Sequence, residues 1–148
     1  MRILSIALFS ILLAATTAIA GFALKSGVYS INELDAAKSE ALSGKKAVAF
    51  LYSDKNTFCT QCASASLQAM DTMIDSCVVV YIDRSDAINL PEEVKNALRS
   101  PKAGKYIPTV VVMSYDLKKV ITIVPYARGG AYKQLLCEAK EKILSYRK

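Results

Sequence analysis

Two cysteines separated by two residues, Cys59-Thr60-Gln61-Cys62, are the side chains of this sequence best suited to chemistry. They follow the apolar run 47–52 and stand where a helical pattern begins. A thiol at a helix N-terminus has a lowered pKa, because free N–H groups and the helix dipole stabilise its thiolate. The second thiol, one turn later, can attack a mixed disulfide and release the partner. The spacing therefore predicts a redox dithiol, with Cys59 as the attacking nucleophile and Cys62 as the resolving thiol.

The alternative for the same pair is a structural disulfide that never opens. A disulfide that closes so short a loop constrains the unfolded chain less than one that closes a long loop. The position at a helix start also leaves one sulfur open to attack. Both arguments favour the redox interpretation.

The chain contains no histidine. This excludes Ser-His-Asp hydrolysis and catalysis by a histidine-bound metal or an imidazole base. A zinc site would need all four cysteines to converge. Met70 and Met73 follow the dithiol, and thioether and thiolate ligands suit Cu(I). Their spacing puts them on the core face of the helix, however, so we expect ordinary packing and no resident metal or cofactor.

The first 20 residues have the pattern of a secretory signal peptide. Met1-Arg2 gives a positive start, residues 3–15 are apolar except for two serines, and Ala18-Ile19-Ala20 is a small-x-small cleavage signal. A membrane anchor is the alternative, but the apolar run is shorter than the roughly 20 residues of a spanning helix. We therefore expect cleavage after Ala20, no stable membrane insertion, and a periplasmic or secreted mature protein of one domain, residues 21–148. Export would place the cysteines in an oxidising compartment.

The charged residues give no sign of a nucleic-acid interface. Lysines and arginines number 19 against 13 acidic residues, and the lysines are scattered with acids among them. Such a pattern is typical of a solvated surface rather than a basic stripe. We expect no nucleic-acid partner.

Apolar periodicity predicts the elements that must position the dithiol. The apolar side of the first helix includes Leu42, and that of the last helix includes Tyr146. The strand after the dithiol helix should run parallel to the strand before it, because right-handed crossovers connect such strands. The predicted order is a short extended segment 22–29, a helix 31–42 opened by a capping box and stopped by Gly44, a strand 47–52, a helix 60–75, a strand 77–82, a helix 91–99, strands 109–113 and 120–124, and a final helix after 128–130.

The other two cysteines leave two outcomes open. Cys77 falls at the start of a buried strand, and Cys137 lies away from the apolar stripe of the last helix. A disulfide between them would require the last helix to be rotated from this assignment. The alternative is a buried, inert Cys77 and an exposed Cys137 that is available to a partner.

This order of elements, with Cys-x-x-Cys after the first core strand and Ile107-Pro108-Thr109 opening the third, resembles the thioredoxin superfamily over nearly the whole mature chain. The resemblance implies an α/β, thioredoxin-like fold with a central mixed four- or five-stranded sheet and helices on both faces. It also implies a cis Pro108 facing the dithiol, where the alternative is an ordinary proline at a strand start. The remaining implied substrate-binding residues are Phe58 as an aromatic lid, Ile107 and Thr109 beside the proline, and Gly129 in the turn before the last helix.

The implied activity is that of an exported thiol-disulfide oxidoreductase that exchanges disulfides with protein thiols and needs no bound cofactor. The Ile-Pro-Thr segment favours a reductase, which would require a membrane electron donor. Two departures from the family keep other hypotheses open. Thr60 and Gln61 replace the residues that the family usually has between the thiols. Residues 47–52 contain no acid to match the buried carboxylate of the family, and Asp54 lies in the loop after them. A redox-inactive binding or assembly module of the cell envelope is the second hypothesis. A Cu(I)-handling protein is the third.

Overall fold

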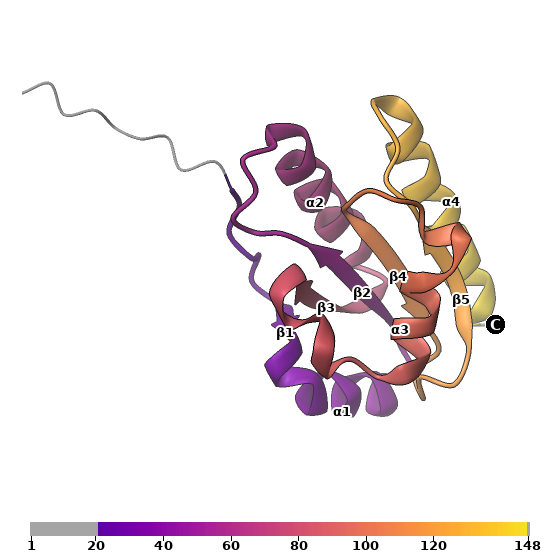
Figure 1. The fold of residues 1–148 in the computed structure, drawn as a ribbon. Coiled ribbons are helices and arrows are strands. Elements are labelled where there is room, and N and C mark those ends of the chain that lie inside the picture. The colour runs from indigo at the N-terminus through magenta and orange to yellow at the C-terminus, as the bar shows by residue number, and fades with distance from the viewer. Residues whose placement is uncertain (1–20, 148) are drawn as a thin grey trace, which may run out of the picture.

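The computed structural model describes residues 21–147, so the predicted signal peptide lies outside the described residues. Its centre is a five-stranded sheet with strand order β1-β3-β2-β4-β5 (Figure 1). The strands are β1 (Val28–Ser30), β2 (Ala47–Ser53), β3 (Cys77–Asp83), β4 (Thr109–Met113) and β5 (Val120–Val124). The helices are α1 (Leu34–Gly44), α2 (Thr60–Met73), α3 (Glu92–Arg99) and α4 (Gly130–Tyr146).

The sheet is mixed, as predicted. β1, β3 and β2 run parallel, because α1 connects β1 to β2 and α2 connects β2 to β3 as helical crossovers. β4 pairs antiparallel with β2, and β5 pairs antiparallel with β4 across the short turn after Met113. Because β2 and β3 lie inside the sheet and are covered on both faces, nearly every residue in them is buried.

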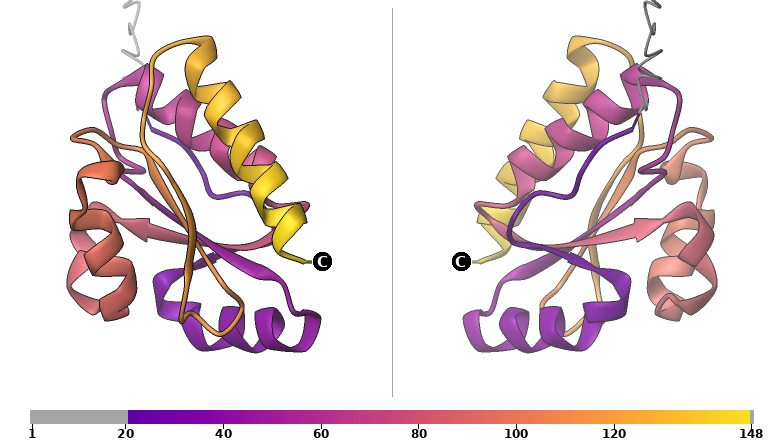
Figure 2. Two further views of the ribbon diagram at one scale, coloured as in Figure 1. Left: turned by 90° about the vertical axis from the view of Figure 1, so that its right-hand side faces the viewer. Right: turned by 90° about the vertical axis from the view of Figure 1, so that its left-hand side faces the viewer.

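Helices cover both faces of the sheet, which confirms the predicted architecture. α2 and α4 lie side by side on one face, and α1 and α3 lie on the other (Figure 2). Alternate residues of β2 supply the two cores: Ala49 and Leu51 face α2 and α4, while Val48 and Phe50 face α1 and α3. The fold is therefore a three-layer α/β sandwich, and the dithiol helix belongs to the layer that also holds α4.

Two helix predictions were wrong in detail. Leu42 and Tyr146 were assigned to apolar stripes, but their side chains are 54% and 36% exposed. Both residues lie in the last turn or two of their helices, and the buried positions of α1 and α4 end earlier, at Ala41 and Ile143. A helical wheel assumes that the apolar side of a helix packs against the protein along its whole length. Here the last apolar residues of both helices extend beyond the surface against which the helices pack.

The start of α1 follows the predicted capping box, with one change. Glu33 accepts a hydrogen bond from the backbone N–H of Ser30 at 2.8 Å. Residues Ile31–Glu33 form a 3-10 turn before the α-helix proper. The helix ends at Gly44, and Lys45 follows in the left-handed conformation. Among residues 21–147, no helix is both long and apolar enough to cross a membrane.

Candidate active site

Cys59 occupies the N-cap of α2 and forms a disulfide with Cys62. The Cα atoms of the two residues lie 5.2 Å apart. The Cys59 sulfur also accepts a hydrogen bond from the backbone N–H of Cys62 at 3.2 Å, as a capping side chain does. Cys59 is exposed and Cys62 is half-buried. An approaching thiol or disulfide can therefore reach the first sulfur more easily than the second.

Local hydrogen bonds shape the loop that carries Cys59 from the end of β2. Asp54 accepts a hydrogen bond from the backbone N–H of Asn56 at 2.9 Å, and its carbonyl accepts one from the N–H of Thr57 at 3.1 Å. The Thr57 hydroxyl in turn accepts a hydrogen bond from the N–H of Cys59 at 3.1 Å. Asp54 is thus a turn residue, and the turn delivers Cys59 to the helix start.

A buried serine pair, which the sequence interpretation missed, links β2 to the first turn of α2. Ser53 and Ser66 are both fully buried, and their hydroxyl oxygens lie 2.7 Å apart. Ser66 donates a hydrogen bond to the carbonyl of Cys62 at 2.8 Å, which leaves its oxygen to accept from Ser53. The signal was weak: Ser53 ends an apolar run, and Ser66 stands between Ala65 and Leu67. The pair stands near the dithiol, where no buried acid was found in the sequence.

The Ile107-Pro108 peptide bond is cis. Pro108 is buried and Ile107 is half-buried. Thr109, which is buried, donates from its hydroxyl towards the carbonyls of Ala103 and Tyr106, each at 3.2 Å. Thr109 pairs with Tyr52 near the carboxyl end of β2, so the proline lies at the end of the sheet where the dithiol loop begins. The structure thus brings the Ile-Pro-Thr segment and the dithiol to the same end of the sheet.

Phe58 differs from the expected aromatic lid. Its side chain is 89% exposed, so it packs against little of the protein and does not cover the disulfide. A lid needs neighbouring surface to lie on, and the polar turn before Cys59 offers none. Phe58 instead presents an apolar ring to solvent beside the exposed sulfur. Its role in substrate binding stays a prediction.

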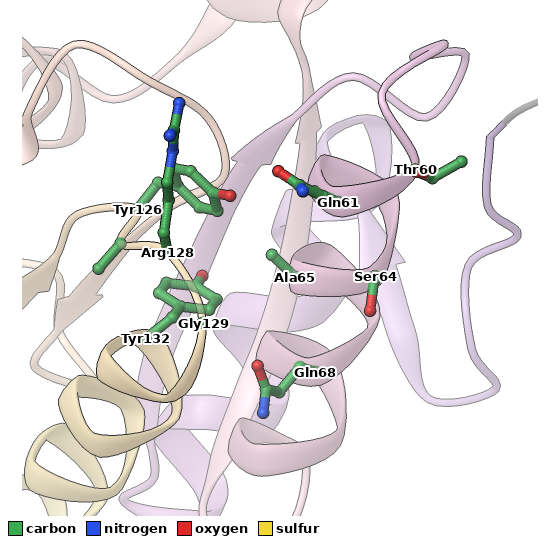
Figure 3. A pocket seen from close by; sticks show the side chains of 10 residues that line it. Thr60, Gln61, Ser64, Ala65, Gln68, Tyr126, Arg128, Gly129 and Tyr132 are labelled. Carbon is green, nitrogen blue, oxygen red and sulfur yellow. The ribbon is translucent and has the colours of Figure 1, made fainter.

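A cleft of about 550 Å³ opens between α2 and the start of α4 (Figure 3). Gln61, Ser64 and Gln68 line it from α2. Tyr126, Arg128, Gly129 and Tyr132 line it from the opposite side. Gly129, predicted as part of the substrate groove, is exposed and serves as the N-cap of α4 with a φ of 61°. The cleft therefore contains one predicted site residue, but Phe58, Ile107, Pro108 and Thr109 do not line it.

Cys77 and Cys137 do not form the internal disulfide that was one of the two open outcomes. Cys77 is buried and Cys137 is exposed, and both are free thiols. Burial raises the pKa of Cys77 to about 11. Met70 and Met73 are also in the core, with 0% and 1% exposure, so they lie away from the exposed sulfur of Cys59. Among the described residues, no three cysteine or acidic side chains form a group that could hold a metal ion.

No family model and no curated protein matches this sequence. Solved structures do match. A wild-type poplar thioredoxin h superposes with a TM-score of 0.52 at 15% identity, covering 76% of this chain and 95% of the other. A mutant of the poplar thioredoxin h gives 0.54 at 14% identity, covering 83% and 92%. A thioredoxin from Nicotiana alata gives 0.50 at 17% identity, covering 86% and 98%. The likeness to the thioredoxin superfamily is thus confirmed for the fold, which this chain shares.

Proposed function

We propose that this protein is an exported thiol-disulfide oxidoreductase that exchanges disulfides with protein substrates through Cys59 and Cys62. The observation that carries the proposal is the position of Cys59, which is exposed, caps α2 and is already bonded to Cys62. The fold shared with thioredoxins supports it.

The geometry gives each sulfur a distinct role. In the reduced protein, the Cys59 thiolate is stabilised by the first-turn N–H groups of α2, including that of Cys62. It attacks one sulfur of a substrate disulfide, forming a mixed disulfide and releasing the other sulfur as a thiolate. Cys62 then loses its proton to water and attacks the Cys59 sulfur, which releases the second substrate thiolate. The substrate gains two electrons, and the protein ends as the Cys59-Cys62 disulfide.

We further propose that the protein works as a reductase in the periplasm or an equivalent exported location. The residues between the thiols are Thr60 and Gln61, so no imidazolium is present there to stabilise the thiolate strongly and make the disulfide a strong oxidant. A reductase in such a place would need a membrane electron donor to restore the dithiol. The leader pattern of residues 1–20 is what supports export.

Trapping tests the exchange directly. In the variant Cys62→Ala, the mixed disulfide on Cys59 cannot be resolved, so covalent partners should accumulate and should be released by a strong reductant. The matched control is the double variant Cys59→Ala/Cys62→Ala, which keeps the exposed thiol of Cys137 and therefore measures the background of partners trapped without the dithiol. If the single variant traps no more protein than the control, the exchange proposal fails.

The reduction potential of the Cys59/Cys62 couple tests the direction. A value near about −270 mV would support a reductase, and one near about −120 mV would mark an oxidant. Cell fractionation with an N-terminal sequence of the mature protein tests export, since cleavage after Ala20 predicts Gly21 as the first residue.

A redox-inactive binding module is the second candidate, and one observation favours it. The buried groups linking β2 to the dithiol turn are serine hydroxyls, which do not accept a proton from Cys62 as a carboxylate could. A Cys59 pKa of about 8.5 or above, together with no turnover of insulin disulfides, would favour this module. A lower pKa with turnover would exclude it.

A further inference from the structure

The cleft between α2 and α4 has the chemistry of an anion site. Arg128 is the one charged side chain among the described residues that line it, and no acidic residue does. Figure 3 shows Tyr126 and Arg128 on one wall of the cleft, with the Tyr126 hydroxyl pointing towards Gln61 on the other wall and the Arg128 side chain extending along its own wall. The neutral polar side chains that line the cleft, those of Ser64 and Gln68 among them, can donate hydrogen bonds.

The start of α4 adds donors to the same wall. Its N-cap is Gly129, so no side chain caps the first turn, and that turn contains no acidic residue. The first N–H groups of a helix have no partner within the helix and carry the positive end of its dipole. A Cβ on Gly129 or Gly130 would meet no heavy atom within 4 Å, so the space over this turn is open.

Tyr132 supplies the independent sign of a ligand. Its side chain lines the cleft, yet it is only 2% exposed and its hydroxyl has no hydrogen-bond partner among the described residues. Burial raises its pKa, so the hydroxyl keeps its proton and remains a donor. A buried donor without an acceptor is costly, and an arriving acceptor would remove that cost. The ring lies 5.8 Å from the ring of Tyr126, whose hydroxyl also faces the cleft (Figure 3).

We propose that this cleft binds a carboxylate of the partner polypeptide, held by Arg128, the uncapped first turn of α4 and the Tyr132 hydroxyl. That the carboxylate belongs to a disulfide-exchange partner rests on the proposed function. The cleft meets the dithiol through Thr60 and Gln61, which lie between the two cysteines and line it. The carboxylate is therefore that of an aspartate or glutamate a few residues from the cysteine that Cys59 attacks. Phe58 and Ile107 lie outside this cleft, so it is a second contact beside the dithiol.

Binding of paired peptides tests the cleft without any exchange chemistry. The peptides are extended, carry serine in place of the reactive cysteine, and differ only in one glutamate or glutamine placed two, three or four residues from it. The oxidised protein, labelled with 15N, is titrated, and the side-chain amide signals of Gln61 and Gln68 report the site. The glutamate peptide should bind about five-fold more tightly than the glutamine peptide, as a charge-assisted contact at a partly exposed site does. Equal affinities at all three spacings would overturn the proposal.

Two variants assign that preference to named groups. Arg128→Gln should reduce the ratio of the two affinities to about one. Lys133→Gln is the matched control, because it removes a positive charge from the next turn of α4 on an exposed residue that does not line the cleft; the ratio should stay near five-fold. Tyr132→Phe keeps the buried ring and should lower the ratio about two- to three-fold, because a hydroxyl donates a stronger hydrogen bond to a carboxylate than to the amide oxygen of glutamine. If Arg128→Gln and Lys133→Gln change the ratio equally, long-range charge explains it and the cleft does not.

Matching disulfide peptides separate this inference from the proposed function. They restore the cysteine as a disulfide, and their reaction with the reduced protein is followed by mass spectrometry. Glutamate-selective binding that depends on Arg128, with no exchange of any peptide, would leave the carboxylate site standing and reject the oxidoreductase. Exchange that proceeds equally well with both peptides, in a protein that binds both equally, would reject the carboxylate site alone.

Discussion

Three of the four cysteines in this chain, Cys59, Cys77 and Cys137, lie in three different surroundings. Cys59 is exposed at the start of α2, where the backbone N–H of Cys62 donates a hydrogen bond to its sulfur. Cys77 is buried at the start of β3, and its burial raises the pKa of the thiol. Cys137 is exposed but sits within α4, where the helix uses its own backbone N–H groups. Of these three cysteines, only Cys59 is both exposed and placed beside backbone N–H donors at a helix start. The position in the fold, and not the thiol itself, therefore selects the nucleophile.

The largest expected effect is the loss of disulfide exchange when Cys59 is replaced. Cys59→Ser should lower the rate of disulfide exchange by on the order of a thousand-fold or more, because a hydroxyl does not replace the thiolate nucleophile. The matched control Cys137→Ser should keep the full rate. Exchange is measured by mass spectrometry with a disulfide peptide. Comparable losses in the two variants would show that the contrast between the cysteines is wrong.

The second prediction uses alkaline pH to expose the buried thiol. The pKa of Cys77 is about 11 in the folded protein against an ordinary value of 9.0, so between these values the unfolded chain loses a proton that the folded chain keeps. Stability therefore falls as pH rises through this window, by up to about 3 kcal/mol for this one group. Below pH 9 the contribution is complete.

Urea unfolding of the oxidised protein at pH 8 and pH 11 measures this loss, with Cys77→Ala as the reference. The variant should lose less stability than the parent between the two pH values. Burial also raises the pKa of Tyr81 and Tyr132, but these residues act equally in both proteins, so the difference isolates Cys77. Parallel losses would mean that the thiol is not shielded.

The third prediction concerns the buried hydrogen bond between Ser53 and Ser66 below the dithiol. Ser66→Ala should destabilise the fold by about 1 to 3 kcal/mol, because it leaves the buried Ser53 hydroxyl without its partner. The double variant Ser53→Ala/Ser66→Ala should recover part of that loss, since no unpaired hydroxyl remains. Both are measured by urea unfolding. If Ser53→Ala lowers the free energy of unfolding in the Ser66→Ala background by about as much again as Ser66→Ala alone does, the two hydroxyls are not a pair.

The smallest effect belongs to Cys137. Cys137→Ser should change the free energy of unfolding by no more than about 0.5 kcal/mol, because the side chain is exposed. In the oxidised native protein, Cys137 should also react with a thiol reagent at once, while Cys77 reacts only on unfolding. Two fast thiols, or none, would refute the difference in burial.

The sequence predicted the buried strands of the molecule better than its exposed parts. β2, β3 and β4 were recognisable as short apolar runs, since strands covered on both faces tolerate few polar residues. β5 is a mostly half-buried edge strand and was recognisable from its β-branched residues. β1 is only three half-buried residues and was predicted merely as extended, because so short an edge strand has no pattern of its own. The number of strands was accordingly left at four or five.

What could not be predicted depends on contacts between distant segments. The Ser53-Ser66 pair joins residues from a strand and a helix, and neither serine is unusual alone. Tyr132 lies on the buried side of α4, but its unpartnered hydroxyl shows only once α2 is packed beside it. The exposure of Phe58 follows from the shape of the turn before Cys59, which the family resemblance did not reveal.

The first described residues bear on how the protein should be handled at the bench. The backbone N–H of Phe22 donates to the carbonyl of Lys55 at 3.1 Å, and a Cβ added to Gly21 would meet that same oxygen at 2.6 Å. Lys25 pairs with Asp71 on α2, so this stretch runs alongside the dithiol helix. An affinity tag fused directly before Gly21 would therefore emerge next to the reactive disulfide and crowd visiting polypeptides. One fused after α4, which ends away from the start of α2 in Figure 1, leaves that approach open.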